Sequence, residues 1–275
     1  MSLLWAVVLV IGAAAVAVAL ILLVRRRAPA GGYFEDGDRA AGVFGVLATG
    51  FSVLLGFIVF LAFANYDVSR SGAETEAIVV AQQFQTAELL PEEATPELSG
   101  ELVCYARSVV EQEWPSMEAG TAGDTINPWG VLLFRTLETI DPETAAEQSA
   151  YDKWLEQTST REAARNDRIH GAEGVIPSPL WIVLFFIAVV ILVFMLFFAD
   201  SAERPQVQGL LIGSVVAVMV ATLLVIKSLD MPFHDGLGSI QPVAMERTLS
   251  IAAQARAAIG RDEPVPCDAV GIPTG

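Results

Sequence analysis

The sequence predicts an all-α, four-span integral membrane protein with an extramembrane helical bundle between spans 2 and 3. Of its 275 residues, 53% are hydrophobic, yet its formal net charge is −16. Both facts fit one chain because the apolar residues lie in four blocks and most acidic residues lie between them. None of the blocks contains Asp, Glu, Lys or Arg, whose charges are costly at mid-membrane.

Each block has the length of about 20 residues that a membrane-spanning helix needs. The four predicted spans are Leu3–Val24, Gly42–Ala64, Leu180–Ala199 and Val207–Ile226. The first is not a cleaved signal peptide, because its arginines (Arg25–Arg27) follow the apolar core instead of preceding it. The chain therefore divides into a first membrane hairpin, an acidic helical segment, a second membrane hairpin and a C-terminal region: 1–64, 65–179, 180–228 and 229–275.

The segment 65–179 carries 21 acidic and 7 basic residues, and its apolar residues recur at helical spacing. One set continues the second span as an amphipathic helix that stops before Pro91: Ala73, Ala77, Val80, Phe84 and Ala87. A second set predicts a helix that ends near Trp114 and Pro115, because a residue before proline avoids helical geometry: Leu98, Leu102, Tyr105 and Val109. A third helix is predicted from Leu133, Leu137 and Ile140.

The remaining predicted helices have recognisable starts. Asp141 is the expected N-cap of a fourth extramembrane helix, with Pro142 at its first position. After the fourth span, a last helix follows Pro242 and has one apolar face: Met245, Leu249, Ala252 and Ile259. We expect the tail from Gly260 onward to be loose.

Two spans carry stripes of residues at helical spacing. Thr49, Val53 and Phe57 share one side of the second span; this side either packs on neighbouring helices or forms a hydrophobic constriction of a pore. A stripe of small residues on the fourth span lets helix backbones approach closely, within the subunit or between subunits: Gly209, Gly213, Ala217 and Ala221.

Signatures of catalysis and metal binding are largely missing. The two histidines, His170 and His234, have no further histidine or cysteine at ligand spacing, and neither a Walker loop nor a Gly-x-Ser-x-Gly element occurs. We therefore expect no enzyme activity, no metal, no cofactor and no nucleic-acid partner. The expected partners are the lipid bilayer, further copies of the chain and small ions.

Charge bias gives an orientation. Arg25–Arg27, Arg39 and Arg204 lie in the two short links between spans, which places those links in the cytoplasm. The segment 65–179 and the C-terminal tail then face the outside of the inner (plasma) membrane. Cys104 and Cys267 lie on this same side, so they either form a disulfide or remain two unrelated thiols.

Several motifs resemble those of bestrophin anion channels and of bacterial membrane proteins described as bestrophin-like. They are "LLGFIVFLAFANYD" (Leu54–Asp67), "LDMPFHDG" (Leu229–Gly236), "YARSVVEQEWPSMEAG" (Tyr105–Gly120) and "PSPLW" (Pro177–Trp181). The resemblance implies a ring of subunits, five in bestrophins, with the second span lining a central pore and Phe57 at its constriction. The resemblance also implies bulky residues in the turns before Phe57. Val53 fits this pattern one turn earlier, whereas Thr49, another turn back, departs from it.

Two further departures accompany the resemblance. The acidic run of the calcium clasp of animal bestrophins is missing after His234, so no calcium gating is expected. Bestrophins also keep their large helical part in the cytosol, whereas the arginine bias of this chain indicates the opposite side.

The segment "KSLDMPFHDG" allows two interpretations. In one, Pro232 ends the helix, Asp230 caps the next segment of the chain and Lys227 reaches to the interface. In the other, which the resemblance favours, Phe233 is a buried anchor beneath the second span near Asn65, and Asp230 satisfies backbone N–H groups nearby.

Two functions remain open at this stage. One is a bestrophin-like oligomeric channel that conducts small ions, with the second span lining its pore. The other is a non-conducting membrane sensor or scaffold whose acidic helical domain binds a partner. The negative charge of the segment 65–179 repels anions from a pore mouth, unless the acids lie away from the axis.

Overall fold

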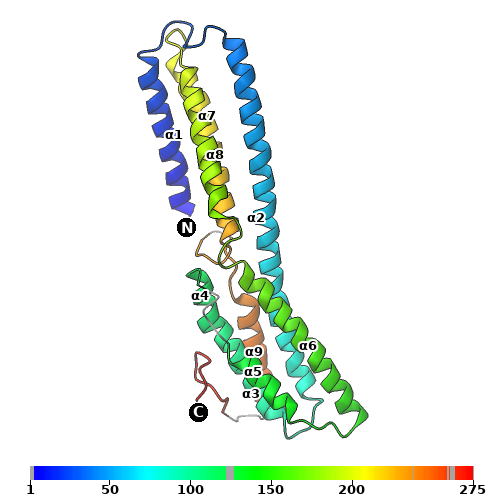
Figure 1. Cartoon of the computed structure of the whole chain (residues 1–275). Coiled ribbons are helices and arrows are strands. Elements are labelled where there is room, and N and C mark those ends of the chain that lie inside the picture. Colours follow the sequence, from blue (N-terminus) through cyan, green and yellow to red (C-terminus); the bar gives the residue numbers. More distant parts are fainter. Residues whose placement is uncertain (1–2, 122–126, 237, 259, 261–263, 275) are drawn as a thin grey trace. The chain divides into compact units, whose positions relative to one another are not determined.

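The computed structural model describes residues 3–121, 127–236, 238–258, 260 and 264–274 (Figure 1). These residues are helices and their connections, and the only β-pairing among them is an isolated bridge between Cys267 and Pro273. The predicted all-α fold is therefore confirmed. The chain forms two compact units, a membrane unit (1–65, 175–230 and 235–238) and a second unit (66–174, 231–234 and 239–275).

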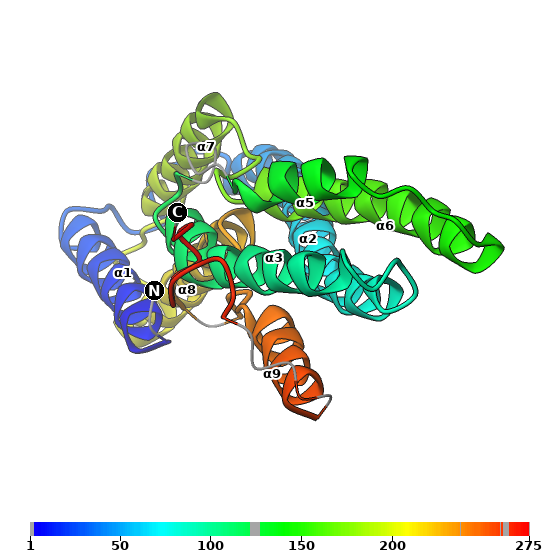
Figure 2. The same ribbon diagram turned by 90° about the horizontal axis from the view of Figure 1, so that it is seen from below.

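Among its described residues, the membrane unit contains four helices, or parts of helices, that are long and apolar enough to cross a membrane. They are α1 (Leu3–Arg25), the first part of α2 (Gly37–Ala87), α7 (Ser178–Phe197) and α8 (Pro205–Asp230). Figures 1 and 2 both show α1 beside α8. The four predicted spans coincide with these helices, although α7 ends two residues before Ala199.

Helix α2 runs without interruption from the membrane unit into the second unit (Figure 1). The apolar face predicted for its part after the membrane packs into the core of the second unit, where Ala77, Val80 and Ala87 are at most 1% exposed. The helix ends at Ala87, before Pro91 as its sequence pattern predicts.

The next helix does not end near Trp114 and Pro115, and that prediction was wrong. Helix α3 (Thr95–Ser108) continues through a π-helical turn, η1 (Val109–Glu113), into α4 (Trp114–Glu118). The Trp114 N–H bonds to the carbonyl of Val109, five residues back. Pro115 is tolerated because it lies in the first turn of α4, where its missing N–H has least effect.

Helix α5 (Trp129–Glu138) follows, and then α6 (Ala145–His170). The N-cap of α6 is Thr144 and not Asp141. Thr144 Oγ1 accepts the Glu147 N–H, and the Glu147 carboxylate accepts the Thr144 N–H, each at 3.2 Å. Asp141 has a threonine three residues later, so it lacks the Glu or Gln that completes this reciprocal cap.

The last helix, α9 (Val243–Ala258), follows Pro242 as predicted. Met245 and Ala252 are buried along its inner face, whereas Ile259 lies outside the described residues. The tail is not loose where the structure describes it, so that expectation was wrong. Residues 264–274 pack against α3 and α5 through a disulfide and several hydrogen bonds.

Candidate functional site

The outer side of α2 brings Thr49, Val53 and Phe57 together on one face. Val53 is 55% and Phe57 65% exposed, and Thr49 is exposed as well. On the opposite side of the helix, Phe51 and Ile58 are at most 5% exposed and belong to the core of the membrane unit. The unit thus leaves open the side that carries the three candidate pore residues.

The same face of α2 becomes polar beyond the membrane. Steps of three and four residues lead from Phe60 to Asp67, Ser71 and Glu74, and all of these residues are exposed. Glu74 accepts a hydrogen bond from Arg70 Nε at 3.0 Å, so this carboxylate is paired. Asp67 precedes Glu74 and is the first acidic residue on this face of α2 after the apolar stretch.

Asp230 is the last residue of α8, and Phe233 follows it by three residues; both side chains are buried. The buried Asp230 carboxylate accepts the N–H groups of Val175 and Ile176, each at 2.9 Å, and so caps the chain that leads into α7. Three residues on, after Pro232, Phe233 is fully buried in the core of the second unit. Asp230 does not cap the residues that come after it; the amides it holds precede the third span.

The small-residue stripe of α8 packs against α1 of the same chain. A Cβ at Gly209 would lie 3.3 Å from Val18 Cγ1, and a Cβ at Gly213 would lie 3.0 Å from Val18 Cγ2. Ala217 and Ala221, further along, are half-buried. At its two glycines the stripe is therefore a packing face within one subunit.

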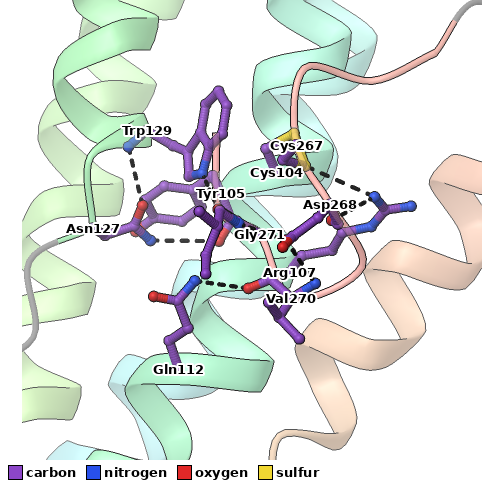
Figure 3. Close-up of a disulfide and its surroundings, with 11 residues drawn as sticks. Cys104, Tyr105, Arg107, Gln112, Asn127, Trp129, Cys267, Asp268, Val270 and Gly271 are labelled. Atoms are coloured by element: carbon purple, nitrogen blue, oxygen red, sulfur yellow. Dashed lines mark hydrogen bonds between the residues drawn. A yellow bond between two sulfur atoms is a disulfide. The ribbon is translucent and has the colours of Figure 1, made fainter. Parts of the chain in front are cut away.

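The C-terminal strap, residues 264–274, is joined to α3 by a disulfide between Cys104 and Cys267, whose Cα atoms are 5.7 Å apart (Figure 3). Trp129 Nε1 donates to the Gly271 carbonyl at 2.6 Å. Arg107 and Gln112 of the helix beneath donate to two more strap carbonyls, at 3.0 and 2.7 Å. The strap thus closes over a face of the second unit that contains Tyr105 and Trp129.

A buried ionic cluster lies in the core of the second unit and was missed by sequence reasoning. Arg168 of α6 is fully buried and bonds to Glu76 at 2.5 Å and to Glu113 at 2.6 Å. Burial opposes its charge, but the two carboxylates outweigh burial and raise the pKa of Arg168. Tyr105 donates to Glu76 at 2.6 Å, and burial followed by this carboxylate raises the pKa of its phenol.

The sequence contained a signal for this cluster. Arg161, Arg165 and Arg168 recur at steps of four and three, so they share one face of α6. The π-helical turn then directs Glu113 toward that face, where it also accepts from Arg165 at 3.3 Å. The spacing of apolar residues does not reveal where a single π-helical turn of this kind interrupts an α-helix.

Within the described residues, no group of three or more His, Cys, Asp and Glu side chains could hold a metal ion. Glu101 is a carboxylate with a raised pKa. Burial raises this pKa to about 7, although a hydrogen bond from Thr136 opposes the shift. Glu101 lies between α3 and α5 in the second unit.

The chain matches a family model over most of its sequence, and its fold resembles that of solved structures. Residues 11–245 match the Bestrophin-like domain. A solved structure of a bacterial bestrophin homologue from Klebsiella pneumoniae, carrying a point mutation, has a TM-score of 0.68 at 11% identity. The match covers 89% of this chain and 99% of that chain. A solved structure described as a membrane protein has a TM-score of 0.66 at 12% identity and covers 90% and 97%. No curated protein matches this sequence.

Proposed function

Because this chain belongs to the Bestrophin-like family, we propose that it assembles as a homo-oligomeric membrane channel for small ions, with α2 lining the pore. The observation that carries this proposal is the open face of α2. Its Thr49, Val53 and Phe57 turn away from the core to which Phe51 and Ile58 belong. In a ring of copies, such faces surround a common axis, as in the pentamer that the resemblance implies.

A pore lined by this face has an apolar stretch followed by a polar, acidic mouth. Val53 and Phe57 are bulky and apolar, so a ring of them restricts water and ions by dewetting. Asp67 adds one carboxylate per subunit beyond that stretch, whereas Glu74 is already paired with Arg70. A ring of carboxylates attracts cations and repels anions. We therefore expect the channel to prefer cations.

The test is current recording on the purified protein in planar bilayers with asymmetric sodium and chloride gradients. Phe57→Ala should increase the current without loss of assembly, because it widens the constriction. Phe186→Ala is the matched control, since Phe186 is 67% exposed on α7 and Phe57 is 65% exposed on α2. Asp67→Asn should shift the reversal potential toward the chloride potential. A monomer on a sizing column, or absent currents from an intact oligomer, contradicts the proposal.

The competing function is a non-conducting membrane sensor or scaffold. It is favoured by apolar side chains that the second unit exposes on α5, where Val131 is 57% and Phe134 47% exposed. Such residues are typical of a surface that binds another protein. The sizing experiment separates the two functions, because a pore built from single α2 helices requires a ring.

The orientation belongs to the same proposal. The arginine bias of the links between spans favours a cytoplasmic position for those links and an extracytoplasmic position for residues 65–179 and the strap. The disulfide is consistent with this side, because structural disulfides persist in oxidising compartments.

A further inference from the structure

A groove of about 590 Å³ runs between α1 and α8, inside the membrane unit. Its walls are two helices that pack side by side (Figure 2). Pro205 and Gln206, at the start of α8, line one part of it. The rest of the lining is aliphatic or small: Val18, Leu22, Gly209, Leu210, Gly213 and Ser214.

The groove is apolar and open toward the outside of the unit. Gly209 and Gly213 have no side chain to fill it, and Leu210 at its edge is 73% exposed. The hydroxyl of Ser214 donates to the Leu211 carbonyl of its own helix at 2.9 Å, so this polar group is already satisfied. Within the spans, the lining therefore favours hydrocarbon.

The depth of the groove in the membrane follows from the two spans that form it. Val18 and Leu22 precede Val24, the last residue of the first apolar block, by six and two residues. These steps correspond to roughly 9 and 3 Å along a helix. On the facing helix, the apolar block begins at Val207. The groove thus opens onto the outer part of a hydrocarbon core about 30 Å thick, on the side of the two short links.

Arginines surround the end of the groove that lies nearest these links. Arg25 follows Leu22 by three residues and therefore lies on the same side of α1, one turn further on. Its Nη2 donates to the carbonyls of Ser201 and Glu203 at 2.8 and 2.5 Å, whereas its Nε has no partner among the described residues. Arg204 directly precedes Pro205 on the other wall.

This end of the groove has an excess of positive charge. The α1 side carries Arg25–Arg27, and the α8 side carries Arg204 with two acidic residues, Asp200 and Glu203. Four positive charges are thus set against two negative ones. Arg26 and Arg204 are exposed, and the ion pairs between described residues do not include them.

The remaining charges near the links lie before and at the start of α2, which lines neither wall of the groove. Phe34, which directly precedes them, packs against Phe198 at the end of α7, with 5.0 Å between the ring centroids. They therefore follow an anchor on α7 and do not adjoin the groove. They are Glu35, Asp36, Asp38 and Arg39.

We propose that this groove binds an acyl chain of an anionic phospholipid, whose phosphate is held by Arg25, Arg26 and Arg204. The aliphatic walls accommodate the chain, and the excess positive charge at its end favours an anionic headgroup over a zwitterionic one. A basic site between membrane helices is typical of such recognition. The proposal depends neither on ion conduction nor on assembly of a ring.

The experiment uses the purified full chain in nanodiscs of phosphatidylcholine. Two photoactivatable probes have the same acyl chain with a diazirine near its end, and they differ only in the headgroup: phosphatidylglycerol or phosphatidylcholine. Light attaches the chain of the probe to the residues beside it, and mass spectrometry of a digest locates the attachment. Both probes are compared on the unaltered chain, so this first result does not depend on the folding of a variant.

Two substitutions then test the two parts of the site. Ser214→Leu fills the groove, and its matched control is Ser52→Leu, because Ser52 is exposed on α2 and also donates to a carbonyl of its own helix at 2.9 Å. Arg204→Gln removes one charge from the end of the groove. Arg39→Gln is its control, since Arg39 is exposed at the start of α2.

We expect the phosphatidylglycerol probe to label the chain around Val18 and Leu210, and the phosphatidylcholine probe to label it several-fold less. Arg204→Gln should need about fivefold more probe for the same labelling, as for one arginine near an anionic surface. Ser214→Leu should lose the labelling, and both controls should retain it.

Three results overturn the proposal. Equal labelling by the two probes means that the groove takes bulk lipid without regard to charge. Labelling that persists in Ser214→Leu means that the chain lies elsewhere on the surface. Absent labelling, with the α1–α8 face instead crosslinked to another copy of the chain, assigns the groove to a neighbouring subunit.

Discussion

Phe233 packs edge-on against Trp114, with 5.5 Å between the ring centroids and 82° between the ring planes. Phe233 is fully buried and Trp114 is 3% exposed, so each ring fills space that water cannot reach. Phe233→Ala should therefore cost about 3–5 kcal/mol of stability, the usual loss for a buried aromatic residue. Chemical denaturation of the purified protein measures this loss.

Phe134→Ala is the matched control for that substitution, because Phe134 is 47% exposed on α5 of the same unit. It should change stability by less than about 1 kcal/mol. If the protein forms a channel, Phe233→Ala should also alter its conductance or gating. Equal stability of the two variants, with unchanged currents, means that the segment with Pro232 and Phe233 is only a helix stop.

The sequence was sufficient for features that depend on local pattern. The four spans and the buried face of α2 followed from hydrophobic blocks and from helical spacing, which are properties of neighbouring residues. The open face with Thr49, Val53 and Phe57 was predicted as a stripe, but its alternatives stayed open. Packing against α7 and α8 decides which side of α2 is covered. The spacing of residues along α2 does not contain that information.

Features that depend on distant residues were missed or misplaced. The π-helical turn positions Glu113 for Arg168, 55 residues later, and a proline-based rule ended the helix there instead. The strap looked loose because residues 264–274 have no helical pattern. It is held by side chains of α3, η1 and α5 that lie more than 140 residues earlier.

Gly271 supports a prediction about how the strap is seated. Its φ is +83°, and a Cβ there would lie 2.5 Å from the nitrogen of Ser108. Gly271→Ala should therefore displace the strap and lower stability by about 1–3 kcal/mol, through strain and overlap together. Gly260→Ala separates the two causes, because Gly260 has φ +70° and no atom within 4 Å of a Cβ. A loss no larger than that of Gly260→Ala means that the strap does not press on α3.

The disulfide and the orientation of the chain can be tested together. A peptide digest without reductant should contain Cys104 and Cys267 as one linked pair, and Cys267→Ser should lower stability by roughly 2–5 kcal/mol. An alkaline phosphatase fused after Glu118 should be active, because that enzyme folds only outside the cytoplasm. Two cysteines that are alkylated freely, with an inactive fusion, would place the second unit in the cytoplasm.

Glu101 gives the second unit a dependence on pH. Its pKa is raised from 4.5 to about 7 in the folded protein, chiefly by burial, with a smaller contribution from Glu97 that raises it further. Between these values the folded state binds more protons than the unfolded state, so stability falls as pH rises from 4.5 to 7 and stays lower above that.

Glu101→Gln removes this carboxylate while its side-chain oxygen still accepts the hydrogen bond from Thr136. It should raise the unfolding temperature at pH 8 and change it little at pH 4.5. Glu138→Gln, an exposed substitution on α5, should leave the pH dependence as it is. An identical pH profile for Glu101→Gln and the unaltered chain shows that this carboxylate is ionised without cost in the folded state.

The contact between Gly213 and Val18 decides what the small-residue stripe does. A Cβ at Gly213 would already lie 3.0 Å from Val18 Cγ2, so the larger side chain of Gly213→Leu must push α1 away from α8. We expect a loss of about 1–3 kcal/mol, the usual cost of overpacking, and release of α1 from the membrane unit. Gly12→Leu, on α1 itself, has no atom within 4 Å of a Cβ and should be tolerated. Crosslinking of a cysteine pair placed in α1 and α8 measures the separation of the two helices. If Gly213→Leu keeps this crosslink but dissociates the oligomer on a sizing column, the stripe joins neighbouring subunits instead.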